Sequence, residues 1–140
     1  MKVFSIYRPI VPELLKIISE RDDGHMAERP KEDFFLVSPK YPIFVVADGV
    51  TLELDENGSY PNPSGAGNIA EIFCKTVLAA AEKRYDTFRQ DNLLEIFREG
   101  NRAASEFNAS KGRSKETSDY WHHDLFAATT AFGLIKENHL

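Results

Sequence analysis

The chain has little of what secreted or membrane proteins contain. It has a single cysteine, Cys74, among 140 residues, so no intramolecular disulfide can form. A reducing compartment is therefore favoured, and we expect a cytoplasmic location. No apolar run approaches the roughly 20 residues that span a bilayer, which argues against a membrane protein. The segment Met1–Arg8 is not followed by the apolar stretch of a signal peptide.

The chain also lacks an excess of positive charge. Lys and Arg number 17 against 22 Asp and Glu, for a net charge of −5. Binding to nucleic acid needs clustered cations that neutralise phosphates, so we expect no nucleic-acid partner. The chain is 42% apolar and 28% charged, which is ordinary for a globular protein. Its length suits one domain with a substantial core.

Two short apolar segments predict neighbouring strands. Residues 34–37 are apolar and end at Ser38-Pro39, and residues 43–47 are apolar and β-branched between Pro42 and Asp48-Gly49. Such runs, bounded by turn residues, are typical of strands. The second run lacks alternation, which predicts a strand buried on both faces. Together they predict an antiparallel pair around residues 38–42.

Helices are expected in the middle of the chain. Ser64 is a candidate N-cap, and apolar residues at helical spacing follow it to about Phe88. Asn92 and Glu95 resemble a capping box that opens a second helix, which ends near Asn108. Residues 125–135 then predict a third buried strand. This order of strands, two antiparallel helices and a strand predicts an α+β fold with an antiparallel sheet.

A sheet with one helical layer leaves its other face uncovered. Either a partner covers this open sheet face, or residues 1–140 are the N-terminal portion of a larger domain whose missing C-terminal half covers it. A short strand at residues 3–7 and an apolar segment at residues 12–18 are further expected elements.

Acidic residues at the strand ends are the candidate metal ligands. Asp48 follows the apolar strand directly and precedes Gly49, which would let a ligand approach the backbone. If the two strands pair as a hairpin, Asp33 lies close to Asp48, with Glu32 beside it. Three carboxylates at one rim repel unless a cation neutralises them, and Mg²⁺ or Mn²⁺ prefers such oxygen ligands. The alternatives are an Asp that opens a turn and a solvated acidic loop.

These residues carry a resemblance to the protein phosphatase 2C family of metal-dependent Ser/Thr phosphatases. The segment Phe44-Val45-Val46-Ala47-Asp48-Gly49-Val50 resembles the central Asp-Gly motif of that family. Lys31-Glu32-Asp33-Phe34-Phe35 resembles its earlier Glu-Asp motif. Ala127-Ala128-Thr129-Thr130-Ala131 is similar to its strand after two helices. The three motifs occur in the family's order over roughly residues 28–137.

The resemblance implies a two-metal phosphatase that acts on phosphoproteins. Asp48 would bridge two Mg²⁺ or Mn²⁺ ions, with the Gly49 carbonyl on one of them. Glu32 and Asp33 would hold a metal or its waters, and the bridging water would attack phosphorus. Residues 1–140 would then be a single partial domain, the N-terminal portion of a phosphatase 2C-like domain and the first half of an α-β-β-α sandwich. Arg29 is nearest to the family's phosphate-binding Arg, but it stands one position closer to the Glu-Asp motif.

The chain departs from the family pattern in two ways. Residues 50–53 replace the glycines that usually follow Asp-Gly, and the family's later Gly-Asp-Ser strand and metal-binding aspartates are absent. We therefore expect the 140 residues alone to be inactive. The alternative function is that of a truncated or degenerate relative acting as a non-catalytic protein-binding module.

Overall fold

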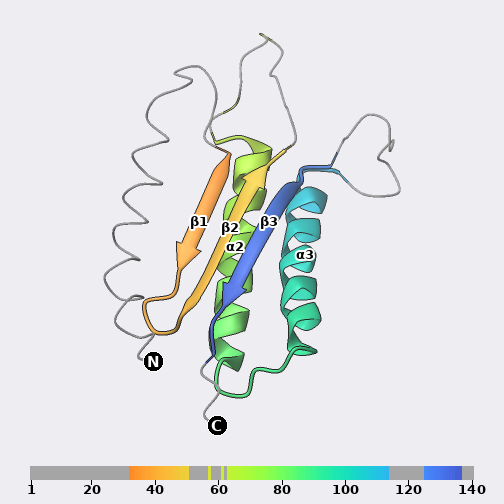
Figure 1. The fold of residues 1–140 in the computed structure, drawn as a ribbon. Helices are drawn as coiled ribbons and strands as arrows, with labels where there is room; N and C mark the ends of the chain where they lie inside the picture. Colours follow the sequence, from red (N-terminus) through yellow and green to blue (C-terminus); the bar gives the residue numbers. More distant parts are fainter. Residues whose placement is uncertain (1–31, 51–56, 58–60, 62, 114–124, 137–140) are drawn as a thin grey trace, which may run out of the picture.

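The structure is a computed structural model with three strands and two helices among the residues it describes (Figure 1). The described residues are 32–50, 57, 61, 63–113 and 125–136. In chain order the elements are β1 (Asp33–Val37), β2 (Ile43–Gly49), α2 (Gly65–Arg84), α3 (Asn92–Ser110) and β3 (Ala128–Leu134). This arrangement confirms the α+β fold expected from the sequence. The expected elements at residues 3–7 and 12–18 lie outside the described part.

The three strands form one antiparallel sheet in the order β1-β2-β3. The pairing of β1 with β2 confirms the predicted hairpin. Its turn is held by Ser38, whose Oγ accepts hydrogen bonds from the N–H groups of Lys40 and Tyr41, both at 3.1 Å. A serine hydroxyl that binds the backbone two or three residues ahead is a common way to fix a turn.

Both helices lie on one side of the sheet, behind the strands in Figure 1. The covered face of β2 presents Ile43, Val45 and Ala47, each at most 1% exposed. These side chains share one buried cluster with Phe73 and Val77 of α2. Because α2 contacts all three strands, it is the element that fixes the sheet to the helical layer.

The helices pack on each other through one close approach. A Cβ at Gly100 of α3 would lie 2.7 Å from the Phe73 ring and 2.8 Å from Val77, so only glycine fits there. Phe73 also meets Phe97 edge-on, with ring centroids 5.7 Å apart. This packing confirms the expected pair of antiparallel helices. No helix in the described ranges combines the length and apolar character needed to cross a membrane.

The opposite face of β2 corrects one expectation. Phe44 is 43% exposed and Val46 is 39% exposed, so β2 is not buried on both faces as its continuous apolar run predicted. β3, also expected to be buried, has exposed Thr129 and Ala131 on the same side. The physical reason is that the helical layer covers one face alone. The exposed side chains of β1, β2 and β3 on the other side define the open face.

The observed ends of the two helices agree only in part with the ends predicted from the sequence. The Ser64 N-cap is confirmed, because its hydroxyl accepts a hydrogen bond from the Gly67 N–H at 3.0 Å. The first helix ends at Arg84, earlier than the expected Phe88. The predicted capping box was wrong: Asn92 is already helical, and its Oδ1 accepts from the Arg89 N–H at 2.8 Å. Asn92 thus bonds to the preceding loop and not to the helix.

Candidate functional site

Asp33 and Asp48 lie directly opposite each other at one end of the sheet. The β1–β2 register makes them Cα partners, and both are exposed on the open face. Thr129 of β3 is the partner of Asp48 on its other side. The predicted proximity of Asp33 and Asp48 is therefore confirmed. A row of three oxygen-bearing side chains crosses the sheet at this end, and we call Asp33, Asp48 and Thr129 the acidic row.

The acidic row places two carboxylates on directly opposite residues. Residues directly opposite in an antiparallel pair have Cβ atoms about 4.5–5.5 Å apart, and like charges there destabilise the sheet. Among the described residues, the Asp48 carboxylate has no hydrogen-bond or ion-pair partner. A divalent cation is the group that would turn this repulsion into attraction. Two adjacent carboxylates suit a hard cation such as Mg²⁺ or Mn²⁺.

Glu32 belongs to a different environment. Its Oε1 accepts a hydrogen bond from the Ser64 hydroxyl at 2.7 Å, and Ser64 is fully buried at the start of α2. α2 has no acidic residue in its own first turn, so Glu32 supplies the negative charge that a helix N-terminus favours. The Glu32 side chain is thus directed to the helical layer, whereas Asp33 and Asp48 lie on the open face.

Because Glu32 lies on the other side of the sheet, the predicted site of three carboxylates is reduced to Asp33 and Asp48. Within the described ranges, no group of three His, Cys, Asp or Glu side chains is close enough to hold a metal. The reason is the alternation of a strand, which sends consecutive side chains to opposite faces. Glu32 and Asp33 are consecutive, so a pair that looks clustered in sequence is divided by the sheet. Arg29 lies outside the described residues.

Gly49 has a structural role that the sequence reasoning missed. A Cβ at Gly49 would lie 2.7 Å from the Ala66 carbonyl carbon and 2.8 Å from its oxygen. The space beside Gly49 on the covered face is therefore filled by the start of α2, and not left for a ligand. The Gly49 N–H donates to the Glu32 carbonyl at 3.1 Å. Gly49 and Glu32 together fix the sheet end against α2.

The role of Ser64 was only half visible in the sequence. Its N-cap function follows from its place before the helix, but its bond to Glu32 spans 32 positions. No local pattern signals such a contact. The place of Thr129 in the acidic row was equally hidden, because it depends on the register of β3 against β2.

Cys74 is a buried residue of α2. It is 0% exposed in the core, and its Sγ lies 3.5 Å from the Phe34 carbonyl oxygen, to which the thiol donates. Burial raises the pKa of the Cys74 thiol to about 11, because the thiolate loses its hydration in an apolar environment. A thiol in this state is a packing residue and a poor nucleophile.

Comparisons with known proteins assign no function to the residues of the acidic row. No family model matches the sequence, and no curated protein or solved structure is significantly similar to it. The geometry of the acidic row and of the two sheet faces therefore carries the argument.

Proposed function

We propose that the chain is the first portion of a metal-dependent phosphatase domain of the protein phosphatase 2C type. The observation that carries this proposal is the register that places Asp33 opposite Asp48 on the open face. Asp48 ends a strand and precedes Gly49, as in the Asp-Gly motif that the sequence resembles. The substrate class would be phosphoserine or phosphothreonine in proteins.

The residues of the acidic row fit divalent cations. Asp33 and Asp48 would hold Mg²⁺ or Mn²⁺ through carboxylate oxygens, and the Gly49 carbonyl could add a further oxygen. Two such ions would supply positive charge for the phosphoryl oxygens and would activate water for attack on phosphorus. Glu32 would act on this site indirectly, because its carboxylate holds the sheet end against Ser64.

The layer arrangement supports the same proposal. The described strands carry helices on one face only (Figure 1). The other face carries both exposed apolar side chains and the acidic row. In an α-β-β-α sandwich, a second sheet would pack on that face. The acidic row would then lie at the edge of the interface between two sheets, where groups from both could meet.

Metal binding is the readout that tests this proposal. Thermal unfolding of the chain should shift to higher temperature in millimolar Mn²⁺, because a ligand that binds only the folded state adds stability. Asp48→Asn should abolish the shift, since the amide retains the shape but removes the charge. Asp86→Asn, an exposed Asp after α2, is the matched control. An equal Mn²⁺ shift in wild type and Asp48→Asn would contradict the proposal.

A second candidate function is that of a non-catalytic binding module. The observation that favours it is the exposure of Phe44 and Val46, which are neighbours on the open face. Large exposed apolar patches commonly mark protein contacts. This candidate predicts no Mn²⁺ effect on stability, together with saturable binding of a β-rich partner that Val46→Lys disrupts. Loss of that binding in Asp48→Asn, with Val46→Lys unaffected, would contradict it.

A further inference from the structure

The outer edge of β3 has no neighbouring strand among the described residues, because the sheet order is β1-β2-β3. In an antiparallel pair, alternate residues of a strand direct their backbone groups to the partner. The Val50 N–H donates to the Ala127 carbonyl, and the Ile135 N–H donates at the other end of β3, so the odd-numbered residues of β3 bond to β2. The even-numbered residues direct their N–H and C=O groups away from β2. They are Ala128, Thr130, Phe132 and Leu134.

This edge lacks the features that usually prevent a sheet edge from pairing. Soluble proteins protect such edges with Pro, with charged side chains or with a covering element. β3 is seven residues long and contains neither Pro nor a charged residue. Among the described residues, the outward backbone groups of Thr130, Phe132 and Leu134 have no hydrogen-bond partner. A further strand could therefore form a continuous set of backbone hydrogen bonds with β3.

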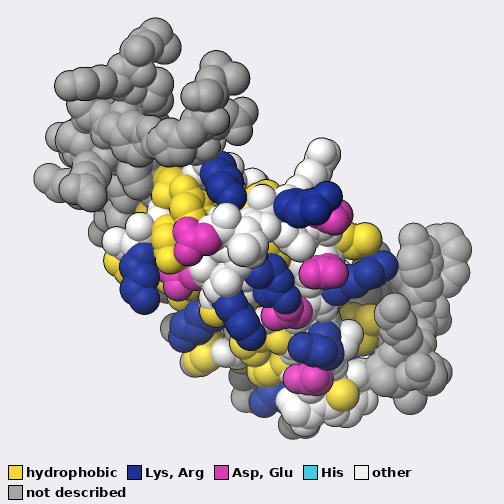
Figure 2. All heavy atoms as spheres, turned by 90° about the horizontal axis from the view of Figure 1, so that it is seen from below, with side chains coloured by type: hydrophobic (Ala, Val, Ile, Leu, Met, Phe, Trp, Pro, Cys, Tyr) yellow, Lys and Arg dark blue, Asp and Glu magenta, His cyan; other side chains and the backbone are white. Residues whose placement is uncertain are grey.

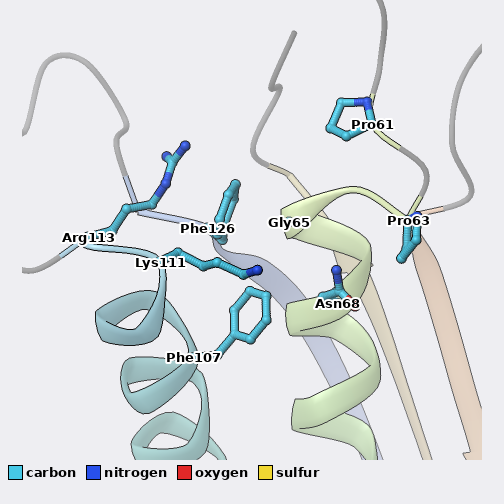
Figure 3. Close-up of a pocket in the computed structure, with 8 residues that line it drawn as sticks. All are labelled: Pro61, Pro63, Gly65, Asn68, Phe107, Lys111, Arg113 and Phe126. Carbon is cyan, nitrogen blue, oxygen red and sulfur yellow. The ribbon is translucent and has the colours of Figure 1, made fainter. Parts of the chain in front are cut away.

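α3 lies beside β3 on the side away from β2, one layer behind the sheet (Figure 1). Two aromatic contacts place it along the length of β3. Phe97 meets Phe132 edge-on, with ring centroids 6.0 Å apart. Toward the other end of α3, the ring centroids of Phe107 and Phe126 are 6.1 Å apart (Figure 3). α3 therefore lies behind the position that a fourth strand would occupy.

One side of α3 presents exposed side chains to that position. Gly100 packs against α2, and Phe97 contacts β3. Leu94, Arg98 and Asn101 follow each other at helical spacing beside Phe97, on the side away from Gly100. All three are exposed, Leu94 by 58%, and we call them the α3 stripe. Arg98 has no ion-pair partner among the described residues. A strand beside β3 would thus meet an apolar, a cationic and a polar group in turn.

The charge of the α3 stripe is of one sign. Seen from below, the described residues carry basic and acidic side chains interspersed (Figure 2), and a mixed surface of that kind does not select one sign of partner. In the α3 stripe, Arg98 is the charged member. Because the whole chain has a net charge of −5, attraction of an acidic segment to this edge would be a local effect that overall charge opposes.

A single extended segment fits this position, whereas a second copy of the chain does not. A second copy that paired antiparallel through its own β3 would carry its helices on the same face of the sheet. Since each α3 extends past the edge of its own β3 (Figure 1), the two α3 helices would require the same space. A strand without a helix on that face avoids the collision.

We propose that the outer edge of β3 binds an extended segment of a partner polypeptide as a fourth, antiparallel strand. Backbone hydrogen bonds supply the affinity, as in other cases of strand addition, and alternate side chains supply the specificity. The side chains that point to the helical layer place an apolar group against Leu94 and an acidic group against Arg98. This contact is separate from the acidic row and does not depend on the proposed metal site.

Backbone amide NMR of the full chain tests this edge with the synthetic peptide Thr-Val-Thr-Glu-Thr-Val-Thr as the probe. EDTA keeps the acidic row free of metal, so the result is independent of metal binding. We expect saturable shifts and slower hydrogen exchange at the amides of Thr130, Phe132 and Leu134. The amides of Thr129 and Ala131 are directed to β2 and should change less.

Two N-methylated peptides separate backbone pairing from contact by side chains. Residues that lie directly opposite in an antiparallel pair share a face, so the valines and the glutamate direct their N–H groups to β3 when their side chains face α3. N-methyl groups on the two valines should therefore lower the affinity at least about tenfold. N-methyl groups on the two inner threonines block N–H groups that point away from β3, and they should leave the affinity nearly unchanged.

A peptide with Lys in place of Glu tests the role of Arg98. It should bind the wild-type chain more weakly than the Glu peptide, and Arg98→Gln should remove the difference. Arg98 is exposed, so the variant should retain the fold. Equal affinity of the wild-type chain for the two peptides would overturn the acidic preference.

Two substitutions of Thr130 test the edge from the side of the chain. Thr130→Pro removes an outward N–H and leaves the bonds to β2 intact, which is the kind of edge position where Pro is tolerated. It should abolish peptide binding. Thr130→Val retains the N–H and should bind like wild type. Unfolding midpoints check both folds, and the N-methylated peptides test the same bonds on the wild-type chain if Thr130→Pro does not fold.

Four results would overturn the proposal. The first is an absence of saturable shifts at Thr130 and Phe132, and the second is equal affinity for the two N-methylated peptides. The third is equal binding by folded Thr130→Pro and Thr130→Val. The fourth is slow exchange at Thr130 and Phe132 before any peptide is added, which would show that the chain itself or a second copy already fills the edge.

Discussion

The two faces of β2 show how one strand can serve two purposes. Val45 and Val46 are consecutive valines, yet Val45 is 1% exposed beneath α2 and Val46 is 39% exposed on the open face. The covered face contains the core side chains and the close approach of Gly49 to Ala66. The open face contains exposed apolar groups and the acidic row. Stability should therefore depend on one face and binding on the other.

The two faces differ in the same way at the end of the sheet. Glu32 and Asp33 are adjacent carboxylates, but Glu32 bonds with buried Ser64 on the covered side, and Asp33 lies opposite Asp48 on the open side. One carboxylate stabilises a helix start, while the other raises the local negative charge. Residues with the same chemistry thus acquire opposite effects from the period of the strand.

The largest expected difference between the faces comes from truncating the two valines. Val45→Ala should lower the free energy of unfolding by about 2–3 kcal/mol, because it removes buried methyl groups and leaves a cavity. Val46→Ala should cost less than about 1 kcal/mol, since its side chain already contacts water. Urea unfolding of both variants measures this. Equal losses would show that the open face is buried in solution.

Two glycines extend the comparison. Gly49→Ala should cost about 2 kcal/mol, because the new Cβ would meet the rigid backbone of Ala66 at 2.7 Å. Gly133→Ala places its Cβ 2.2 Å from the Phe44 ring. That ring is 43% exposed and can rotate toward solvent, so the change should be nearly neutral. Unfolding midpoints in urea compare the two, and a larger loss for Gly133→Ala would reverse the expected ranking.

The sequence predicts the fold well wherever the signals are local. The hairpin follows from two apolar runs around a Pro-rich turn, and the start of α2 follows from Ser64 before an amphipathic segment. The burial of β2 was mispredicted because a continuous apolar run cannot say how many layers surround it. Phe44 is apolar but is covered by no described layer.

The candidate site was predictable only in part. Proximity of Asp33 and Asp48 follows from the hairpin, since its register is set by the short turn. The bond of Glu32 to Ser64 joins segments that are distant in the chain. Such a contact depends on how α2 packs on the sheet, and a single sequence contains no local signal for that packing.

The buried thiol gives the covered face a pH dependence of its own. The pKa of Cys74 rises from 9.0 to about 11 on burial, so the folded chain keeps a proton that the unfolded chain has lost between these values. Stability is therefore complete below about pH 9 and falls as pH rises toward 11, by about 1.4 kcal/mol at pH 10. Urea unfolding at pH 7 and pH 10 measures this fall.

Cys74→Ala should be less stable than wild type at pH 7, because the substitution leaves a small cavity. The variant has no thiol, so it should not show the loss of stability that the thiol causes between pH 9 and pH 11. The difference between wild type and variant should thus shrink as pH rises. All other ionisable side chains are common to both proteins, so the comparison cancels their contribution. A constant difference from pH 7 to pH 10 would show that the thiol is hydrated in the folded chain.

The smallest expected effect is the most informative about the open face. In EDTA at low salt, Asp48→Asn should raise the free energy of unfolding by about 0.5 kcal/mol, because it removes one of two like charges on directly opposite residues. Asp86→Asn removes the same charge away from the acidic row and should not stabilise the chain. Added salt should shrink the gain in Asp48→Asn, since exposed charges are screened. A loss of stability in Asp48→Asn without metal would mean that the carboxylate already has a favourable partner, and the electrostatic reason for a cation at the acidic row would then disappear.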